Sequence, residues 1–546
     1  MKKNRYLRRR KQNKELKIDV MSDKKTGRQL SEGFQSFEEL RDNKCVYVDK
    51  TDMVWELANS KKYIFLSRPR RFGKSLLTST LQCYFEGKKD LFNGLKIMDK
   101  ETEWVSRPVF KFDFSNCITA DDLLEKLDVR LGEYEAIYGK NPAAKNPGNR
   151  MLMLLKNAYL QSGIQSATLV DEYDFPLQHS LFNEAEHERL VKVYQNFFPP
   201  FKEYGNYLKC LFLTGCTKFT NLGLFSINNA NSIVSSWPKY ATLCGITKQE
   251  LIDNYMPEIK ELGEKKGWTV EETIEELRNM YDGYRFSSDM DKAVYNPFSL
   301  VNALAEKEIT NYWISSGGST MLNEMLIRSD ENRENLEECS ITENKLDMSD
   351  VGKGDIKLFL YQTGYLTIKE HFDGGYTLGI PNREVREAIY EILLPNAMSK
   401  ENDFVDSTIS DMRKALKKGD IVGMLENMKL LISQIPYPSR KEEHYYEERF
   451  QYFVSCALYL CGCTVNYEVP MSTGRIDLVA KYKNIIMAIE LKLDNNGGVE
   501  AAKKQLKERN YTSALTNKGK DVYAVAISFS TEDNIRGVSG YDVKKI

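Results

Sequence analysis

The sequence predicts an α/β protein with two sheet-containing domains. Over residues 60–235, apolar strand candidates alternate with helical segments, a pattern typical of a parallel sheet with helices on both faces. Within this region, residues 63–77 read as a short apolar strand, a loop and a Gly-Lys-Ser that opens a helix. The last hundred residues instead combine a helical segment with a hairpin of two apolar strands, which predicts a second, smaller α/β domain.

Length and composition indicate a soluble protein of several domains. The 546 residues leave room for two to four domains, and 42% hydrophobic residues support sizeable cores. The net charge of −1 creates no overall attraction to nucleic acid. The ten cysteines lack metal-ligand spacing, the N-terminus has no apolar signal region, and the longest apolar run, near residues 453–463, is too short to span a bilayer. We therefore expect a cytoplasmic protein without a membrane segment.

Positive charge is concentrated at the start of the chain. Nine of the first 17 residues are lysine or arginine, against one glutamate. Such a run is typical of a disordered, solvated tail, and we expect this for residues 1–27. Contact with nucleic acid is the alternative, since lysine and arginine neutralise phosphates.

Residues 68–75 have the context of a phosphate-binding loop. Amides at the loop and at the helix N-terminus would face phosphates, and the helix dipole favours negative charge there. Lys74 would reach the β- and γ-phosphates, and the Ser75 hydroxyl would bind Mg²⁺. Two residues depart from the usual motif, because Arg68 replaces a glycine and Pro69 has no amide donor. The motif alone therefore leaves open an ordinary helix cap.

Asp171 and Glu172 end a later apolar strand that begins near residue 166. An acidic pair at a strand end is the usual partner of a phosphate loop. Asp171 would hold Mg²⁺, and Glu172 would polarise the attacking water. An exposed acidic turn is the alternative, which the pairing with the 68–75 loop disfavours.

Other strands and helices complete this domain. We expect strands at residues 108–114 and 208–215, and helices at residues 121–138 and 149–159. The polar tip of the last strand makes Thr214 a candidate sensor of the γ-phosphate. Lys218, Arg70 and Arg71 are candidates for neutralising phosphate charge, and nothing local selects among them.

The central part of the chain turns helical. Residues 247–331 carry helical periodicity with charged outer faces and predict a small helical lid. Residues 332–350 are charged and poorly periodic, which indicates a linker, and the whole interval 332–440 is expected to be linker and mixed helical structure.

The C-terminal region, residues 441–546, brings acidic residues onto strands. A hairpin of strands 475–480 and 485–493 would place Asp477 opposite Glu490, and Glu490 shares a strand face with Lys492. Two carboxylates can bind Mg²⁺, and a lysine can orient or help deprotonate a water. A surface hairpin is the alternative, but the preceding Gly474-Arg475-Ile476 and the later Gln505 and Tyr511 favour a nuclease site.

Several blocks together resemble a known bacterial and archaeal architecture, an AAA-ATPase-like domain followed by a PD-(D/E)XK nuclease-superfamily domain. The resemblance covers about residues 33–546, and Arg-Pro-Arg-Arg-Phe-Gly-Lys-Ser is similar to that family's own phosphate loop. The blocks are Gly33-Phe34-Gln35-Ser36-Phe37, Tyr47-Val48-Asp49-Lys50-Thr51, the 67–75 loop, Val170-Asp171-Glu172-Tyr173-Asp174, Thr214-Gly215-Cys216-Thr217-Lys218-Phe219, Tyr281-Asp282-Gly283-Tyr284 and Tyr295-Asn296-Pro297-Phe298.

The resemblance implies a P-loop NTPase parallel sheet (28–246) with a helical lid (247–331) and an α/β domain of the restriction-endonuclease type (441–546). It implies ATP and Mg²⁺ as cofactors, with ATP held by the loop residues Arg70, Arg71, Phe72, Gly73, Lys74 and Ser75, and with Asp171 and Glu172 as the acids.

At the C-terminus the resemblance implies metal binding by Asp477 and Glu490 with Lys492 beside them. It also implies a helical glutamate, for which Glu447 fits and Glu448 is nearly as good. Nucleic acid is the expected partner, and self-association is left open. Two alternatives stand beside the nuclease: a signalling or scaffold ATPase whose C-terminal fold binds without cutting, and an interaction module in which both domains are catalytically silent.

Overall fold

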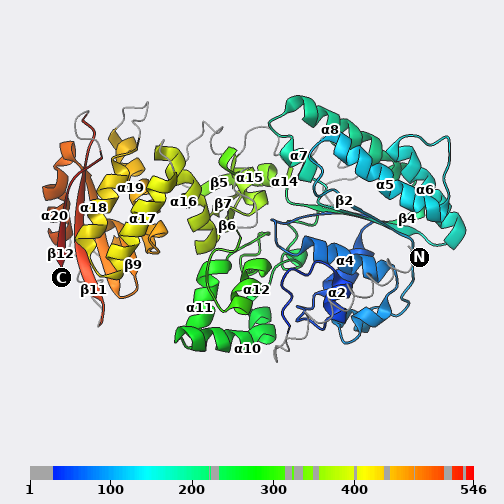
Figure 1. Ribbon diagram of the computed structural model, residues 1–546, viewed down its shortest axis with the longest axis horizontal. Helices are drawn as coiled ribbons and strands as arrows, with labels where there is room; N and C mark the ends of the chain where they lie inside the picture. Colours follow the sequence, from blue (N-terminus) through cyan, green and yellow to red (C-terminus); the bar gives the residue numbers. More distant parts are fainter. Residues whose placement is uncertain are drawn as a thin grey trace, which may run out of the picture.

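The computed structural model describes residues 29–219, 222, 233–313, 322–324, 336–348, 356–398, 402–435, 443–471, 474–508, 519–532 and 537–546. The basic tail expected at residues 1–27 and Tyr511 lie outside these residues. Along the long axis of the molecule, the sheet β1–β4 occupies one end, the sheet β8–β12 the other, and the small sheet β5–β7 lies between them (Figure 1).

The N-terminal domain is built on a four-stranded sheet in the order β1-β4-β3-β2. All neighbouring strands pair in parallel, which confirms the predicted parallel sheet. The strand that carries Thr214 lies between the strand before the loop and the strand that ends at Asp171. The strands are β1 (Tyr63–Ser67), β2 (Val109–Asp113), β3 (Ser166–Asp171) and β4 (Leu208–Gly215).

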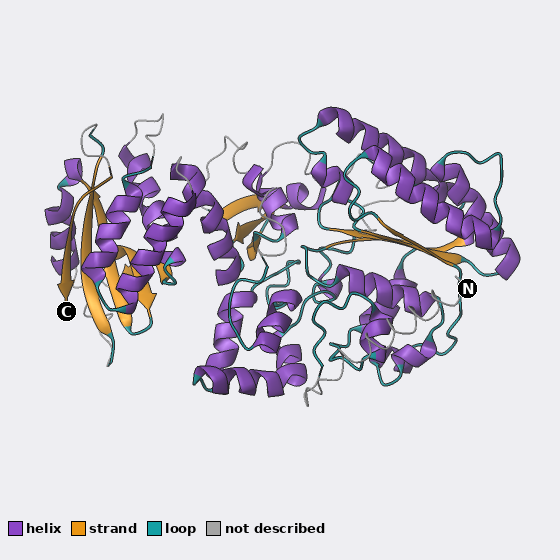
Figure 2. Cartoon of the chain, in the orientation of Figure 1, coloured by secondary structure: helices purple, strands orange, loops and turns teal. Residues whose placement is uncertain are grey.

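Helices cover both faces of this sheet (Figure 2). Successive residues of a strand point to opposite faces, so Ile64 and Leu66 pack with α3 and α4, whereas Phe65 packs with α5, α6 and α8. The helices are α2 (Phe37–Asp42), α3 (Thr51–Ser60), α4 (Lys74–Phe85), α5 (Ala120–Tyr138), α6 (Pro147–Ser162), α7 (Phe175–His179), α8 (Glu184–Phe197) and α9 (Pro199–Glu203).

Three helices form the predicted lid, α10 (Lys248–Lys266), α11 (Val270–Tyr281) and α12 (Pro297–Glu306). Capping boxes begin the first two, at Thr247 and Thr269, and the Asn296 side chain caps the third. Their apolar sides share one core, into which Leu30 and Val46 of the N-terminal segment also pack.

A small antiparallel sheet follows, in the order β5-β7-β6. Its first strand lies in the interval expected to be a linker, where the described residues 336–348 form β5 and α14. Ile341 is buried and pairs with Tyr376 of β7, but one buried residue between polar neighbours gives too short a pattern to predict a strand. The elements are β5 (Cys339–Thr342), α14 (Glu343–Met348), α15 (Ile356–Thr363), β6 (Thr367–Phe372), β7 (Gly375–Gly379), α16 (Arg383–Met398), α17 (Asn402–Lys417) and α18 (Ile421–Ile432).

The C-terminal domain is a five-stranded mixed sheet in the order β12-β11-β10-β9-β8. Strands β10 and β11 are parallel and are joined through α20, which packs on one face, while α18 and α19 pack on the other. This confirms the expected α/β domain. The elements are α19 (Glu443–Leu460), β8 (Thr464–Met471), β9 (Gly474–Tyr482), β10 (Ile485–Leu493), α20 (Gly498–Glu508), β11 (Asp521–Ser530) and β12 (Gly537–Lys545).

Arg68, the residue that departs from the usual motif, is a buried anchor of the loop. Its side chain is 1% exposed, and its guanidinium donates hydrogen bonds to the carbonyls of Ser67 (2.8 Å), Ser235 (2.9 Å) and Tyr240 (2.9 Å). The same group lies 4.3 Å from the ring centroid of Phe286. The start of the loop is therefore tied to the segment that leads into the lid.

The other side of the loop meets the central segment. The Trp313 indole donates to the Arg70 carbonyl (3.4 Å), and the amides of Tyr312 and Trp313 donate to one carboxylate oxygen of Glu384, at 2.8 and 2.9 Å. Glu384 lies in the first turn of α16 and is 0% exposed. Its buried carboxyl thus fixes the segment that contacts the loop.

Replacing Arg68 by glycine, the residue usual at this position, is expected to destabilise the protein. Because the carbonyls of Ser67, Ser235 and Tyr240 lose a charged donor, we expect a loss of about 3 kcal/mol in the free energy of unfolding. Urea unfolding of the full chain measures it. Arg71→Gly is the matched control, since Arg71 is exposed and has φ of 69°, which glycine adopts without strain. Equal effects of the two substitutions would contradict the anchoring role.

Glu384 is expected to make stability pH-dependent. Burial raises its pKa to about 7, although the amides of Trp313 and Tyr312 oppose the shift. The pKa of Glu384 in the folded protein is above the ordinary value of 4.5, so its contribution to the free energy of unfolding is fully present below about pH 4.5. This contribution, about 3 kcal/mol, is lost as the pH rises through about 7. Glu384→Gln keeps the acceptor oxygen, so relative to wild type it should gain stability between pH 5 and pH 8. Urea unfolding at each pH measures this, and free energies of unfolding that change in parallel with pH in the two proteins would contradict it. Glu271→Gln, at an exposed position, is the control.

Candidate functional site

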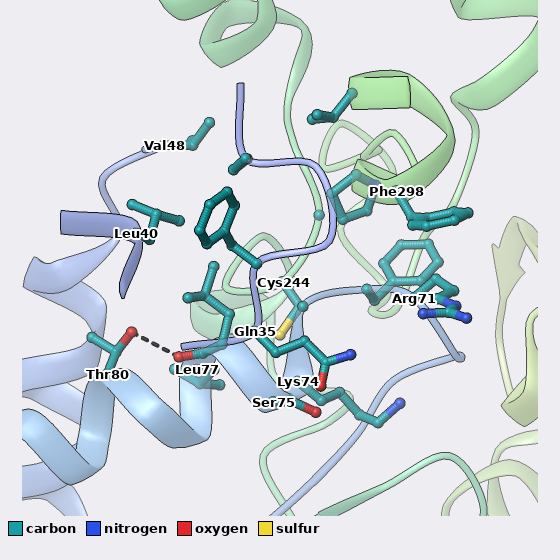
Figure 3. A pocket seen from close by; sticks show the side chains of 18 of the residues that line it. Gln35, Leu40, Val48, Arg71, Lys74, Ser75, Leu77, Thr80, Cys244 and Phe298 are labelled. Carbon is teal, nitrogen blue, oxygen red and sulfur yellow. Dashed lines mark hydrogen bonds between the residues drawn. The ribbon is translucent and has the colours of Figure 1, made fainter. Parts of the chain in front are cut away.

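A cavity of about 620 Å³ opens between the 70–77 loop, the N-terminal segment and the lid. Lys74, Ser75 and Arg71 line one side of it, and Val48 and Leu40 lie across from them (Figure 3). Phe298, at the start of α12, faces Arg71, and its ring centroid is 4.8 Å from the guanidinium carbon. The lid therefore forms part of the cavity wall.

The loop has the backbone expected of a phosphate-binding loop. Gly73 caps α4 with φ of 81°, a left-handed conformation that favours glycine, and no atom lies within 4 Å of the place where a Cβ would be. The N-terminus of α4 begins at Lys74, so its unpaired amides and its dipole are directed at the cavity.

Lys74 lies under the loop and is 4% exposed. Its ammonium donates to the Pro69 carbonyl (3.1 Å) and to the Cys216 sulfur (3.3 Å). Burial acts to lower the pKa of Lys74, but Cys216 and the carboxyl groups of Glu172, Asp174 and Asp171 act to raise it, and the net shift is upward. The lysine thus carries its positive charge into the site.

Asp171 ends β3 beside Ser75 and is 4% exposed. Burial raises its pKa to about 6, while the hydrogen bond with the Ser75 hydroxyl and the charge of Lys74 oppose the shift. A hydroxyl and a carboxylate form the hard-oxygen donor set that Mg²⁺ prefers, and a cation there would favour the ionised carboxylate. These two residues fit the metal that the family implies.

Glu172 follows Asp171 in a left-handed conformation, with φ of 48°. Such a conformation costs about 1–3 kcal/mol for a residue other than glycine and is concentrated at functional sites. The turn is held because the Tyr173 amide donates to the Thr214 carbonyl (3.1 Å) and the Phe175 amide donates to the Glu172 carbonyl (3.1 Å). Glu172 lines the cavity together with Lys74 and Ser75.

Of the other predicted loop residues, two line the cavity and the side chain of one is buried in the core. Arg70 and Arg71 line the cavity, and Arg70 donates to the Gln178 side chain (3.2 Å). Phe72 also borders it, but its ring is 1% exposed and packs against Tyr284 and Phe286.

Three predicted residues do not border this cavity within the described chain: Asp171, Thr214 and Lys218. Asp171 instead lines a smaller cavity beside α4, together with Ser75. Thr214 is 0% exposed, and its hydroxyl donates to the Leu66 carbonyl (2.9 Å) in the neighbouring strand. Lys218 is 6% exposed, and its amide donates to the Gln362 side chain (2.9 Å).

The far wall of the cavity was not predicted. It is formed by residues that no local pattern marks as ligands, although several belong to the blocks that carry the resemblance. They include Phe34, Val48, Ile246, Phe298 and Asn302.

A second candidate site lies in the C-terminal sheet. Strands β9 and β10 pair antiparallel as far as Leu478 opposite Ile489, so Asp477 and Glu490 lie next to the last pair of this register. The Lys492 ammonium lies 3.6 Å from a Glu490 carboxylate oxygen, which confirms that the two share a face. Glu490 is 0% exposed, and Asp477 accepts a hydrogen bond from the Leu491 amide (2.8 Å).

The remaining predicted residues of this site lie on helices. Glu447 and Glu448 fall in the first turns of α19, and their side chains lie outside the described structure. Gln505 is half-buried on α20, the helix that packs on the Glu490 face. Within the described residues, no group of three or more His, Cys, Asp or Glu side chains is arranged to hold a metal ion.

No helix in the described part of the chain is long and apolar enough to cross a membrane. The ten cysteines are all free, and nine of them are buried, as expected of core thiols.

Comparison with known proteins gives matches along the whole chain. Residues 31–225 match the family model described as predicted AAA-ATPase, and residues 441–538 match that of the PD-(D/E)XK nuclease superfamily. An uncharacterized protein in the vnfD 5′ region of Azotobacter chroococcum mcd 1 is 29% identical over 534 residues, which cover 95% of this chain and 99% of that protein.

Among solved structures, the Aeropyrum pernix ORC2 protein, determined as ADPNP-ADP complexes, aligns with 63% of this chain and 88% of its own. The two are 12% identical with a TM-score of 0.21, too low to compare their arrangements. The two family matches coincide with the two sites described above. Residues 31–225 therefore form a domain that matches the predicted AAA-ATPase family, and residues 441–538 form one that matches the PD-(D/E)XK nuclease superfamily.

Proposed function

We propose that the protein binds ATP with Mg²⁺ in the 620 Å³ cavity and hydrolyses it. The observation that supports this is the meeting of Lys74, Ser75 and Glu172 at one cavity, with Asp171 beside Ser75 at the end of β3. A cavity of this size accommodates a nucleotide-sized ligand.

Each residue has a defined part in this reaction. The α4 amides and Lys74 bind phosphate oxygens, and Ser75 with Asp171 would hold Mg²⁺, which supplies charge stabilisation on those oxygens. Glu172 accepts a hydrogen bond from the attacking water and orients it. Lys74 must leave the Pro69 carbonyl and Cys216 to reach a phosphate, which exchanges two weak acceptors for a charged one.

Two substitutions separate binding from turnover. Lys74→Ala is expected to abolish binding of a fluorescent ATP analogue, because the buried cation is lost. Glu172→Gln should retain binding and lower phosphate release at least about a hundredfold, since the water loses its base. Exposed Lys202→Ala on α9 is the control. If Lys74→Ala binds the analogue as tightly as wild type, the cavity is not the nucleotide site.

For the C-terminal domain, we propose Mg²⁺-dependent cleavage of phosphodiester bonds in nucleic acid. The supporting observations are that Asp477 and Glu490 lie next to the pair of Leu478 and Ile489, and that the Lys492 ammonium lies 3.6 Å from a Glu490 carboxylate oxygen. The two carboxylates would supply metal oxygens, and Lys492 is placed to hold a water. A domain that binds nucleic acid or protein without cutting is the competing function, since no group of three or more His, Cys, Asp or Glu side chains of the described chain is arranged to hold a metal ion.

The competing functions give opposite results with plasmid, linear and single-stranded DNA and RNA, with and without ATP. Under the nuclease proposal, Asp477→Asn and Glu490→Gln each reduce Mg²⁺-dependent cleavage at least about a hundredfold. Lys492→Met keeps the metal ligands but loses most of the rate. Exposed Lys481→Ala, on β9, is the control, and ATP hydrolysis should be unchanged in all variants. Wild type inactive on every substrate with Mg²⁺ or Mn²⁺ supports the binding module instead.

A further inference from the structure

A third acidic residue, Asp113, lies at the carboxyl edge of the first sheet. It ends β2, and the parallel register pairs it directly with Asp171. Paired residues of parallel strands point to the same face of a sheet, here the face on which α4 packs. The tertiary structure therefore brings Asp113 to the same side as Asp171 and Ser75.

A second cavity, of about 400 Å³, adjoins the first one beside α4. Ser75, Asp171 and Asp113 are among its lining residues. Within the described chain, the two cavities share four lining residues, and these mark the place where they meet: Gly33, Gln35, Ser75 and Asp113. Asp113 therefore borders this junction together with Ser75, the residue whose hydroxyl is assigned to Mg²⁺.

The Asp113 side chain is held in place yet remains accessible. One carboxylate oxygen accepts a hydrogen bond from the Ser115 amide (2.8 Å), and the residue is exposed, whereas Asp171 is 4% exposed. Its charge reaches the site, since Asp113 adds to the rise in the pKa of Asp171 that burial mainly causes. An exposed carboxylate with a fixed orientation can accept hydrogen bonds from water.

Mg²⁺ in phosphate sites keeps several of its waters and uses one or two carboxylates plus phosphate oxygens. We propose that Asp113 is a positioning residue that accepts hydrogen bonds from waters of the Mg²⁺ held at Ser75 and Asp171. The inference rests on the proposed nucleotide function and assigns Asp113 to the metal–water shell, a role distinct from that of Glu172, which faces the attacking water.

The test is the Mg²⁺ concentration that half-saturates binding of a fluorescent ATP analogue to the full chain. Asp113→Asn keeps an acceptor for the Ser115 amide, so the turn is preserved. Loss of a charged acceptor should raise the half-saturating Mg²⁺ concentration about tenfold. Affinity for the analogue in EDTA should equal or exceed that of wild type, because a negative charge near the phosphates is removed. Exposed Asp90→Asn, in the same domain, should match wild type.

The outcomes distinguish this inference from the proposal beneath it. If the wild-type protein fails to bind the analogue, both the proposed nucleotide function and the role of Asp113 are wrong. Wild type that binds it equally well with and without Mg²⁺ overturns only the role of Asp113. An unchanged Mg²⁺ midpoint in Asp113→Asn also overturns that role, even if phosphate release falls. An equal loss of affinity with and without Mg²⁺ would show that Asp113 serves only the 113–116 turn.

Discussion

The buried guanidinium of Arg68 is the interaction on which the geometry of the nucleotide site depends. A charged group at 1% exposure is costly unless it is hydrogen-bonded, and both terminal nitrogens of the Arg68 guanidinium donate to backbone carbonyls. Two of these carbonyls, of Ser235 and Tyr240, belong to the segment between β4 and the lid. Where other phosphate loops use a glycine to free the backbone, this loop is fixed by a side chain that crosses to another part of the fold.

The loop is also confined on its opposite side. Gly364 has φ of 92°, and a Cβ there would come within 2.6 Å of the Pro69 side chain, so the two segments are in close contact. Beyond this contact, α16 packs on α19, with Tyr390 stacked on Tyr459 and Arg386 lying over the same ring. Packed side chains therefore run from the nucleotide cavity to the helix that carries Glu447. Any movement of the loop would therefore require these closely packed side chains to rearrange.

The two candidate sites differ in how the negative charge of their buried carboxylates is compensated. Around the nucleotide cavity, Arg70, Arg71 and Lys74 lie with the carboxylate of Glu172, and Lys74 offsets the charge of Asp171. In the C-terminal sheet, Glu490 is fully buried and has the Lys492 ammonium at 3.6 Å. A buried carboxylate is costly without a close positive charge, so a cation shared with Asp477 would complete its compensation. This cost supports the proposed metal dependence of the second site.

Local periodicity let the sequence alone predict the parallel sheet, the helical segment that follows it and the antiparallel strands that carry Asp477 and Glu490. Strand alternation repeats every two residues, so a short segment specifies which side chains share a face. The loop and the Asp171-Glu172 pair were likewise identified from residues adjacent in the chain.

Contacts between distant segments were decided only by the tertiary structure. The hydrogen bonds of Arg68 join residues 167 and 172 positions apart, and no pattern near residue 68 indicates them. The same holds for the inward-bonded hydroxyl of Thr214, for strand β5 in the expected linker, and for Asp113 beside Ser75. Sequence periodicity specifies the face of an element, whereas the partner that covers this face depends on how the elements pack.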